Sequence, residues 1–252
     1  MNYIDILQTA ISIAHEAGLI VRQRFPRTAL ADIGFKSTTE PVAETDTIVE
    51  GLIVARLQDA FPGHHILAEE SGLIVRDGTE ADGELHSTSL AGSVAGGETP
   101  MWVVDPVDGT NNFAHGFPHV GISIALLVAG RPVVGVIHDP LRDQTFVAER
   151  GSGAELDGAP IRVSRVARLD HAVVSLDWGH SDEDRGRTLG SLNRVAPRCG
   201  TVRALGSAAL ALAYVAAGWL EAYFNLMMKP WDAAAGILLA AEAGGRCTTL
   251  EG

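Results

Sequence analysis

Apolar residues recur at helical spacing in several stretches of the chain. In the first stretch Ile4, Leu7 and Ile11 fall on one helical face, and Pro26 ends the run because proline cannot continue a helix. The last stretch stops at Gly244-Gly245, a pair typical of helix C-termini. The pattern predicts helices over residues 3–25, 45–60, 206–218 and 232–243.

Runs of apolar residues between these stretches are typical of strands. Strands are predicted over residues 64–70, 101–105 and 221–226, with more strands and tight turns between residues 120 and 150. Residues 72–99 are rich in glycine, serine, threonine and acids, and they are predicted to form a long surface loop. The mixture of helices and strands predicts an α/β fold.

Composition and charge narrow the class of protein. The chain has 252 residues, of which 46% are hydrophobic, and its net charge is 19 − 31 = −12. These are globular values, and the acidic balance argues against binding to nucleic acid. The N-terminus lacks the basic start of a secretory signal, and the most apolar run, Ala208 to Leu220, falls short of the ~20 residues that span a bilayer. We therefore expect a soluble, cytoplasmic protein that binds neither nucleic acid nor membrane.

Three segments place a carboxylate at the end of a predicted strand or the start of a predicted helix. They are LAEESG at 67–72, DPVDGTN at 105–111 and PWDAA at 230–234. Pro106 is expected to end its strand, after which Asp108 folds back towards Asp105 and the carbonyl of Val107 stays free. Thr110 and Asn111 can open a short helix whose N–H groups favour an anion. Hard oxygen ligands beside a phosphate cradle suit Mg²⁺ and a phosphate ester.

Each of these segments also has a purely structural interpretation. Asp232 could be a helix N-cap, the Asp-Pro-x-Asp-Gly segment could be an ordinary turn, and Glu69-Glu70 could be a solvated edge. The histidines show no metal-binding spacing such as HExxH, so His119 and His138 are predicted to be loop or packing residues.

Taken together, the segments carry a resemblance to a known family. The stretch DPVDGTNNFAHGFPHVGISIAL resembles the first signature of the inositol monophosphatase family of magnesium-dependent, lithium-sensitive sugar phosphatases, and PWDAAAGILLAAEAGG resembles its second. LAEESG and PVAETDTIVE lie upstream in the expected order, and the resemblance covers roughly residues 3–250.

The resemblance implies a layered α-β-α-β-α sandwich. It implies one phosphatase domain over residues 1–252, with two lobes at about 1–150 and 151–252, the metal site between them, and a homodimer. Members of the family continue for another strand and helix beyond the second signature, so the resemblance implies that the sequence stops short of that tail.

The resemblance also implies a ligand set and catalytic roles. Two or three Mg²⁺ ions would be bound by Glu69, Asp105, the carbonyl of Val107, Asp108 and Asp232. Thr110 would hold the attacking water, Asp46 would orient the Thr110 hydroxyl, and Glu69 would help to activate the water. Attack would be direct, without a phosphoenzyme.

Substrate contacts follow from the same resemblance. They would come from Asp108, Gly109, Thr110, Ser207, Ala208, Asn225 and Asp232. The animal inositol enzymes carry a glutamate where this chain has Asn225, so other polyol phosphates stay open beside inositol 1-phosphate. The alternatives are fructose 1,6-bisphosphate, histidinol phosphate, a nucleotide 3′-phosphate, or a non-catalytic protein that binds a partner on the same fold.

Overall fold

The structure, a computed structural model, describes residues 3–25, 34–35, 41–42, 44–74, 99–179 and 181–249. Its helices are α1 (Tyr3–Arg24), α2 (Glu44–Ala60), α3 (Thr110–Ala114), α4 (Asp182–Val195), α5 (Ala208–Ala216) and α6 (Pro230–Glu242), with a 3₁₀ turn at Leu169–His171. The four predicted helices are thus confirmed as α1, α2, α5 and α6, with small shifts of their ends.

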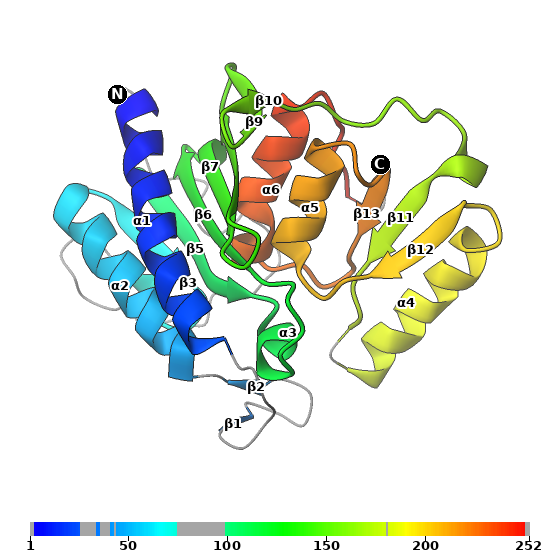
Figure 1. Cartoon of the computed structure of the whole chain (residues 1–252), viewed down its shortest axis with the longest axis horizontal. Helices are drawn as coiled ribbons and strands as arrows, with labels where there is room; N and C mark the ends of the chain where they lie inside the picture. The colour runs from blue at the N-terminus through cyan, green and yellow to red at the C-terminus, as the bar shows by residue number, and fades with distance from the viewer. Residues whose placement is uncertain are drawn as a thin grey trace.

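A large sheet of eight strands forms the centre of the molecule (Figure 1). Its strands are β3 (His65–Ala68), β4 (Gly72–Ile74), β5 (Met101–Asp108), β6 (Gly121–Val128), β7 (Arg131–Asp139), β8 (Gln144–Glu149), β9 (Gly153–Leu156) and β10 (Ala159–Pro160). They lie in the order β10-β9-β8-β7-β6-β5-β3-β4, and only β3 and β5 pair in parallel. A short pair, β1 (Gly34–Phe35) and β2 (Pro41–Val42), lies apart from it.

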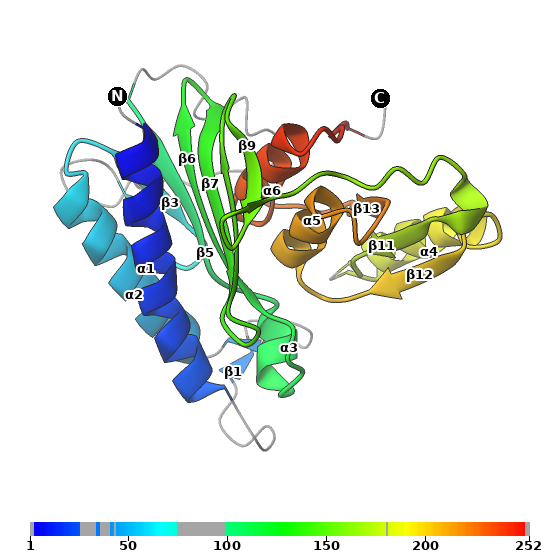
Figure 2. The ribbon, with the colours of Figure 1, turned by 45° about the horizontal axis from the view of Figure 1, so that its top comes forward.

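A second, parallel sheet has three strands in the order β12-β11-β13. They are β11 (Val173–Leu176), β12 (Thr201–Ala204) and β13 (Ala222–Phe224). In Figures 1 and 2 the layers follow one another as α1 with α2, the large sheet, α5 with α6, the small sheet, and α4. This order is the predicted α-β-α-β-α sandwich.

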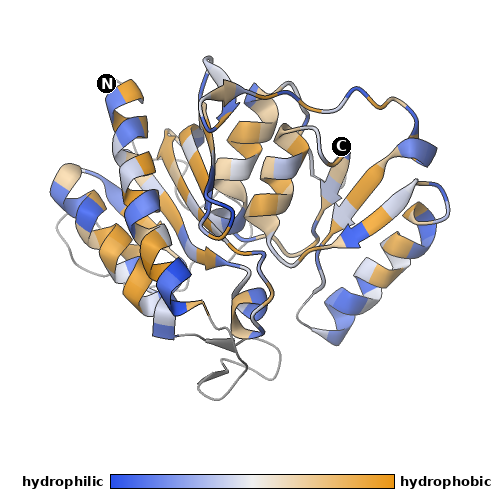
Figure 3. Cartoon of the chain, viewed as in Figure 1, coloured by the Kyte–Doolittle hydropathy of each residue, from blue (hydrophilic) through white to orange (hydrophobic). Residues whose placement is uncertain are grey.

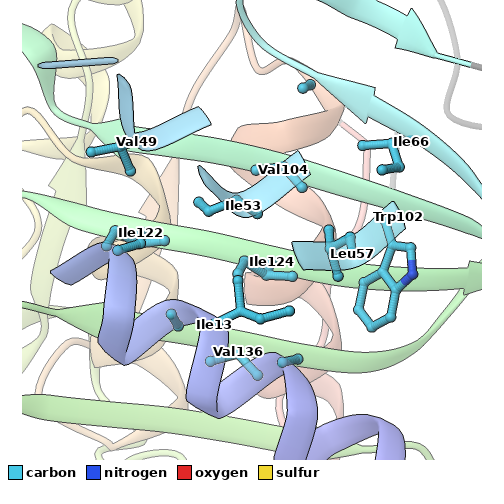
Figure 4. Close-up of a cluster of buried hydrophobic side chains, with 14 of the residues drawn as sticks. Ile13, Val49, Ile53, Leu57, Ile66, Trp102, Val104, Ile122, Ile124 and Val136 are labelled. Carbon is cyan, nitrogen blue, oxygen red and sulfur yellow. The ribbon is translucent and has the colours of Figure 1, made fainter. Parts of the chain in front are cut away.

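The main core lies between the large sheet and the helices α1 and α2. Figure 4 shows Ile13 of α1 and Ile53 of α2 directed at Val104 and Ile124 of the sheet. By length and hydropathy α1 could span a membrane, a feature that the sequence prediction missed. Its apolar face is buried against the sheet and α2, and Figure 3 shows hydrophilic residues along its other face.

Two local predictions need correction. The strand predicted to end at Asp105 continues through Pro106 to Asp108, and its pairing with β6 shifts register between Asp105 and Asp108. Such a bulge is one of the places where a strand tolerates proline. Residues 72–74, predicted as loop, form β4 at the edge of the sheet, and residues 75–98 of that loop lie outside the described residues.

Candidate active site

Three aspartates converge at the end of β5. Asp105 and Asp108 come from β5, and Asp232 comes from the first turn of α6, which packs on the large sheet. One carboxylate oxygen of each lies within 4.8 Å of the others. We call these residues the carboxylate cluster. Residues separated by more than a hundred positions in the sequence therefore meet at one point, as the sequence analysis required.

The bulge in β5 arranges the backbone at this point. The N–H of Val107 donates to Asp105 Oδ1 at 3.1 Å, and the Thr110 hydroxyl donates to the Val107 carbonyl at 3.2 Å. The prediction that this carbonyl stays free is therefore wrong, because the start of α3 brings the Thr110 hydroxyl to it. Gly109 has a φ of +96°, and a Cβ there would lie 2.9 Å from the Gly206 carbonyl oxygen. Both the left-handed backbone and this close approach require glycine.

Asp108 also caps the helix α5. Its carboxylate accepts from the Ser207 hydroxyl and from the N–H groups of Ala208 and Ala209, at 3.2 and 2.8 Å for the two N–H groups. Ser207 is buried, and its hydroxyl oxygen accepts from the Leu210 N–H. Asp108 thus joins the large sheet to α5, which packs beside α6.

Asp232 lies in the first turn of α6, which begins at Pro230, two residues before the predicted start. Its Oδ2 accepts from the backbone N–H of Lys229 at 2.7 Å. The N-cap position belongs to Lys229, so Asp232 is not the N-cap that the structural interpretation suggested. The Ser123 hydroxyl of β6 donates to the Trp231 carbonyl at 3.1 Å, which ties this turn to the sheet.

Burial and mutual repulsion raise the pKa values of the cluster. The pKa of Asp105 is raised well above its usual value, mainly by burial and then by the charges of Glu69, Asp108 and Asp232. Burial raises the pKa of Asp108 to about 6, and burial with the Asp108 charge raises that of Asp232 to about 8. Buried like charges need a compensating cation, and carboxylate oxygens are the ligands that hard divalent ions prefer. The residues present therefore fit a metal ion.

Glu69 lies in the turn between β3 and β4, and its charge acts on both Asp105 and Asp232. The buried carboxylate of Glu50, on α2, shapes this turn. It accepts from the Glu70 and Ser71 N–H groups at 2.8 Å each. Sequence reasoning missed Glu50, whose partners lie about twenty residues away.

Asp46 is buried near the N-terminus of α2, and its charge also raises the pKa of Asp105. Its expected action on the Thr110 hydroxyl stays a prediction, because the resolved acceptor of that hydroxyl is the Val107 carbonyl.

The cluster opens on a cavity of about 590 Å³. Its walls come from both sheets and from the starts of α5 and α6. The lining residues are Glu69, Asp105, Val107, Asp108, Gly109, Thr110, Asn111, Asp177, Trp178, Ser181, Asp184, Gly206, Ala208, Asn225, Met227, Lys229, Trp231 and Asp232. Six of the seven predicted substrate contacts line this space, and the exception is Ser207, which bonds to Asp108 behind it.

Comparison with known proteins decides the family. The sequence model that describes the inositol monophosphatase family matches residues 3–252. The chain belongs to this family. It is therefore assigned to the phosphoric monoester hydrolases, as the sequence resemblance implied. The family is metal-dependent, and the carboxylate cluster supplies the oxygen ligands for such an ion.

Individual relatives agree with the assignment. The chain is 38% identical over 245 residues to inositol monophosphatase 2 of Solanum lycopersicum, covering 96% of this chain and 86% of the relative. It is 34% identical over 241 residues to Nus factor SuhB of Escherichia coli K12, covering 95% and 83%. The crystal structure of the extragenic suppressor protein suhB from Bartonella henselae is 33% identical, covers 95% and 85%, and has a TM-score of 0.82.

The family signatures do not include all of the polar cavity wall. Asp177, Ser181 and Asp184 line the cavity from β11 and the start of α4, a region in which sequence reasoning assigned no element. A signal for Asp177 was present, because the run VVSLD ends an apolar strand in an acid as MWVVD does. The rule that identified Asp105 would therefore also have identified Asp177.

Proposed function

We propose that the protein hydrolyses the phosphate monoester of a small polyol, with inositol 1-phosphate as the leading substrate and Mg²⁺ as the metal. The observation that carries this proposal is the carboxylate cluster, whose buried like charges face a cavity large enough for such an ester. A folded protein tolerates such repulsion where a bound cation offsets it.

The residues of the chain would divide the work of hydrolysis. Glu69, Asp105, the carbonyl of Val107, Asp108 and Asp232 would hold two or three Mg²⁺ ions. Bound Mg²⁺ supplies positive charge for the phosphate and lowers the pKa of a coordinated water. Thr110 would hold the attacking water while Glu69 accepts its proton, with Asp46 orienting Thr110.

The phosphate would be placed by the backbone. The N–H groups of Gly109 and Thr110 would donate to its oxygens, since they stand at the start of α3 beside the cluster. Water would then attack phosphorus in line with its bond to the leaving oxygen. That bond would break, and the leaving oxygen would take a proton from solvent water as the alcohol departs towards Ala208 and Asn225. No residue of the chain becomes phosphorylated in this scheme.

A panel of phosphate esters tests the proposal. Phosphate release is measured with Mg²⁺ titrated, using inositol 1-phosphate, fructose 1,6-bisphosphate, histidinol phosphate and a nucleotide 3′-phosphate. We expect the highest kcat/KM for inositol 1-phosphate. Faster turnover of another ester would reject that substrate but keep the chemistry, whereas no Mg²⁺-dependent release from any ester would reject the proposed function.

Two variants link the activity to the cluster. Asp105→Asn should lower kcat/KM on the order of a hundredfold or more, because a metal contributes several kcal/mol to such a transition state. Asp105 suits this test because, among the described residues, its carboxylate accepts one resolved hydrogen bond, whereas Asp108 also caps α5. The matched control is Asp170→Asn, whose exposed carboxylate pairs with Arg168 outside the cavity.

A second candidate function is partner binding on the same fold. The name of the Escherichia coli relative, Nus factor SuhB, favours this candidate. If the protein binds a partner in this way, the Asp105→Asn variant should still bind it while phosphate release is lost. Loss of partner binding together with phosphate release in this variant would argue against a separate binding function.

The homodimer, the cytoplasmic location and inhibition by millimolar lithium also stay proposals.

A further inference from the structure

Residues that follow the carboxyl ends of the three parallel strands β11, β12 and β13 line one wall of the cavity. Asp177 follows β11, Gly206 lies just after β12, and Asn225 follows β13. Ligands of open parallel sheets characteristically bind at this end of the strands. The small sheet therefore faces the cavity with the edge that is suited to recognition.

Asp177 joins the other two strands because β11 lies between them. Its Oδ1 accepts from the Gly206 N–H at 3.1 Å, and its Oδ2 accepts from the Tyr223 hydroxyl at 2.5 Å. One carboxylate thus bonds to the segment that leads into α5 and to the outer strand β13. The burial of Tyr223 and the adjacent Asp177 charge raise the pKa of Tyr223 well above its usual value, so the hydroxyl keeps its proton.

The Tyr223 hydroxyl in turn fixes the amide of Asn225. Since its single proton goes to Asp177, its oxygen is left to accept from Asn225 Nδ2, at 3.1 Å. Asn225 Oδ1 accepts from the Met227 N–H at 2.8 Å. Both ends of the amide are therefore assigned by their partners, and the second proton of Nδ2 is available to an oxygen in the cavity.

We propose that Asp177 and Tyr223 are positioning residues that hold Asn225 and the Gly206 segment as the wall that binds the alcohol part of the substrate. This inference rests on the proposed phosphatase function. In this proposal the carboxylate cluster holds the metal that binds the phosphate, and the hydrogen-bonded residues Asp177, Tyr223 and Asn225 bind the alcohol that leaves. The predicted specificity is for an alcohol with hydroxyl groups that can accept from the Asn225 amide.

The test compares two esters that share the phosphate and differ in the alcohol. Inositol 1-phosphate carries ring hydroxyls, whereas p-nitrophenyl phosphate has none. Tyr223→Phe should raise the KM for inositol 1-phosphate about fivefold, the size of one neutral hydrogen bond, with kcat within about twofold. The kinetics with p-nitrophenyl phosphate should not change. The control is Tyr214→Phe, a buried tyrosine of α5 that does not line the cavity.

A double-mutant cycle shows whether Tyr223 acts through Asn225. In an Asn225→Ala background, Tyr223→Phe should change the KM for inositol 1-phosphate by less than about twofold, because the positioned group is already gone. The inference would be overturned if Tyr223→Phe changed the KM for inositol 1-phosphate equally in both backgrounds. It would also be overturned if the variant changed the KM of both esters equally, or of neither. Asp177→Asn should resemble Tyr223→Phe, and an unchanged KM would also contradict the role of Asp177.

Calorimetry separates this inference from the proposed function. If the native protein releases no phosphate from either ester, the proposed function fails, and binding of inositol 1-phosphate in the presence of Mg²⁺ becomes the readout. About fivefold weaker binding by Tyr223→Phe would then support the positioning role. Equal affinity, or no binding by the native protein, would overturn it.

Discussion

Two strands of the large sheet carry a buried aspartate at or near their carboxyl end, and the two aspartates, Asp105 and Asp139, have opposite surroundings. Asp105 lies near the end of β5, where Glu69, Asp108 and Asp232 repel it. Asp139 ends β7, where it accepts from the Leu141 and Arg142 N–H groups at 3.0 and 2.9 Å and from the Arg142 guanidinium at 2.7 Å. One strand end gathers like charges and the other neutralises its charge.

The end of β7 is satisfied in its other polar groups as well. His15 of α1 and His138 of β7 both bond to the Thr145 hydroxyl, at 2.8 and 3.0 Å. Arg22 of α1 donates to the Pro140 carbonyl at 2.7 Å. Buried polar groups that satisfy one another stabilise a fold, whereas buried groups that repel one another point to an absent ligand. The end of β7 is therefore a point at which α1 packs on the sheet, whereas the end of β5 is a candidate metal site.

The contribution of His138 to the free energy of unfolding should be lost in acid. Burial and the neighbouring His15 lower the pKa of His138 to about 4, from 6.5 in an unfolded chain. Between these values this side chain binds a proton in the unfolded chain but not in the folded one, so the stability that neutral His138 contributes should fall as pH drops from about 6.5 to 4, by up to about 3 kcal/mol. The raised pKa values of Asp105, Asp108 and Asp232 act in the opposite direction over this range, so the difference between the native protein and a His138 variant isolates this side chain. The free energy of unfolding is measured against pH for the native protein and for His138→Gln.

His138→Gln should remove this contribution, so the stability of the native protein relative to the variant should fall by up to about 3 kcal/mol as pH drops from about 6.5 to 4. His119, whose pKa burial also lowers to about 4, keeps its own contribution in the variant. If the free energy of unfolding changed with pH equally in the two proteins, protonation of His138 would not affect stability.

Thr145→Val should destabilise the protein by about 2 kcal/mol, because both histidines lose a partner in a buried site. Chemical denaturation measures the loss, and phosphate release should stay unchanged because Thr145 does not line the cavity. Thr9→Val is the matched control, since its hydroxyl donates to the Asp5 carbonyl on the exposed side of α1. A loss of activity at full stability would contradict the structural role.

Two glycine substitutions give the smallest effects, with opposite signs. A Cβ at Gly18 of α1 would lie 2.6 Å from His138 Nε2, so Gly18→Ala should cost at least about 1 kcal/mol. At Gly51 of α2, no described atom beyond the adjoining backbone lies within 4 Å of the same position, so Gly51→Ala should stabilise the helix by up to about 1 kcal/mol. Thermal unfolding compares them, and a stabilising Gly18→Ala would mean that α1 is not held against His138.

The sequence predicted the elements that apolar periodicity defines and the acids that end apolar runs. Asp105, Asp108 and Asp232 were candidates because strand ends and helix starts carry them, and the family resemblance implied that they form one metal site. The bulge at Pro106 was not predicted, since it depends on pairing with β6. From the sequence alone, Pro106 predicts a turn. In the structure, pairing with β6 keeps the strand going through a bulge.

Partners distant in the sequence account for the other omissions. His138 was predicted to be a loop or packing residue, and the structure buries it in β7. Its link to α1 through Thr145 joins positions 130 residues apart. Asp177, Gly206 and Tyr223 likewise meet only because β11 lies between β12 and β13. Periodicity within one segment carries no information about such a neighbour.

We infer that the carboxylate cluster destabilises the fold until a divalent cation binds. The most direct test measures the free energy of unfolding of the native protein, Asp105→Asn and Asp139→Asn, each in EDTA and in Mg²⁺. In EDTA, Asp105→Asn should be at least as stable as the native protein, whereas Asp139→Asn should be less stable. Mg²⁺ should stabilise both the native protein and Asp139→Asn, but it should have little effect on the stability of Asp105→Asn. An Asp105→Asn protein that is less stable in EDTA and gains as much from Mg²⁺ as the native protein would contradict the claim.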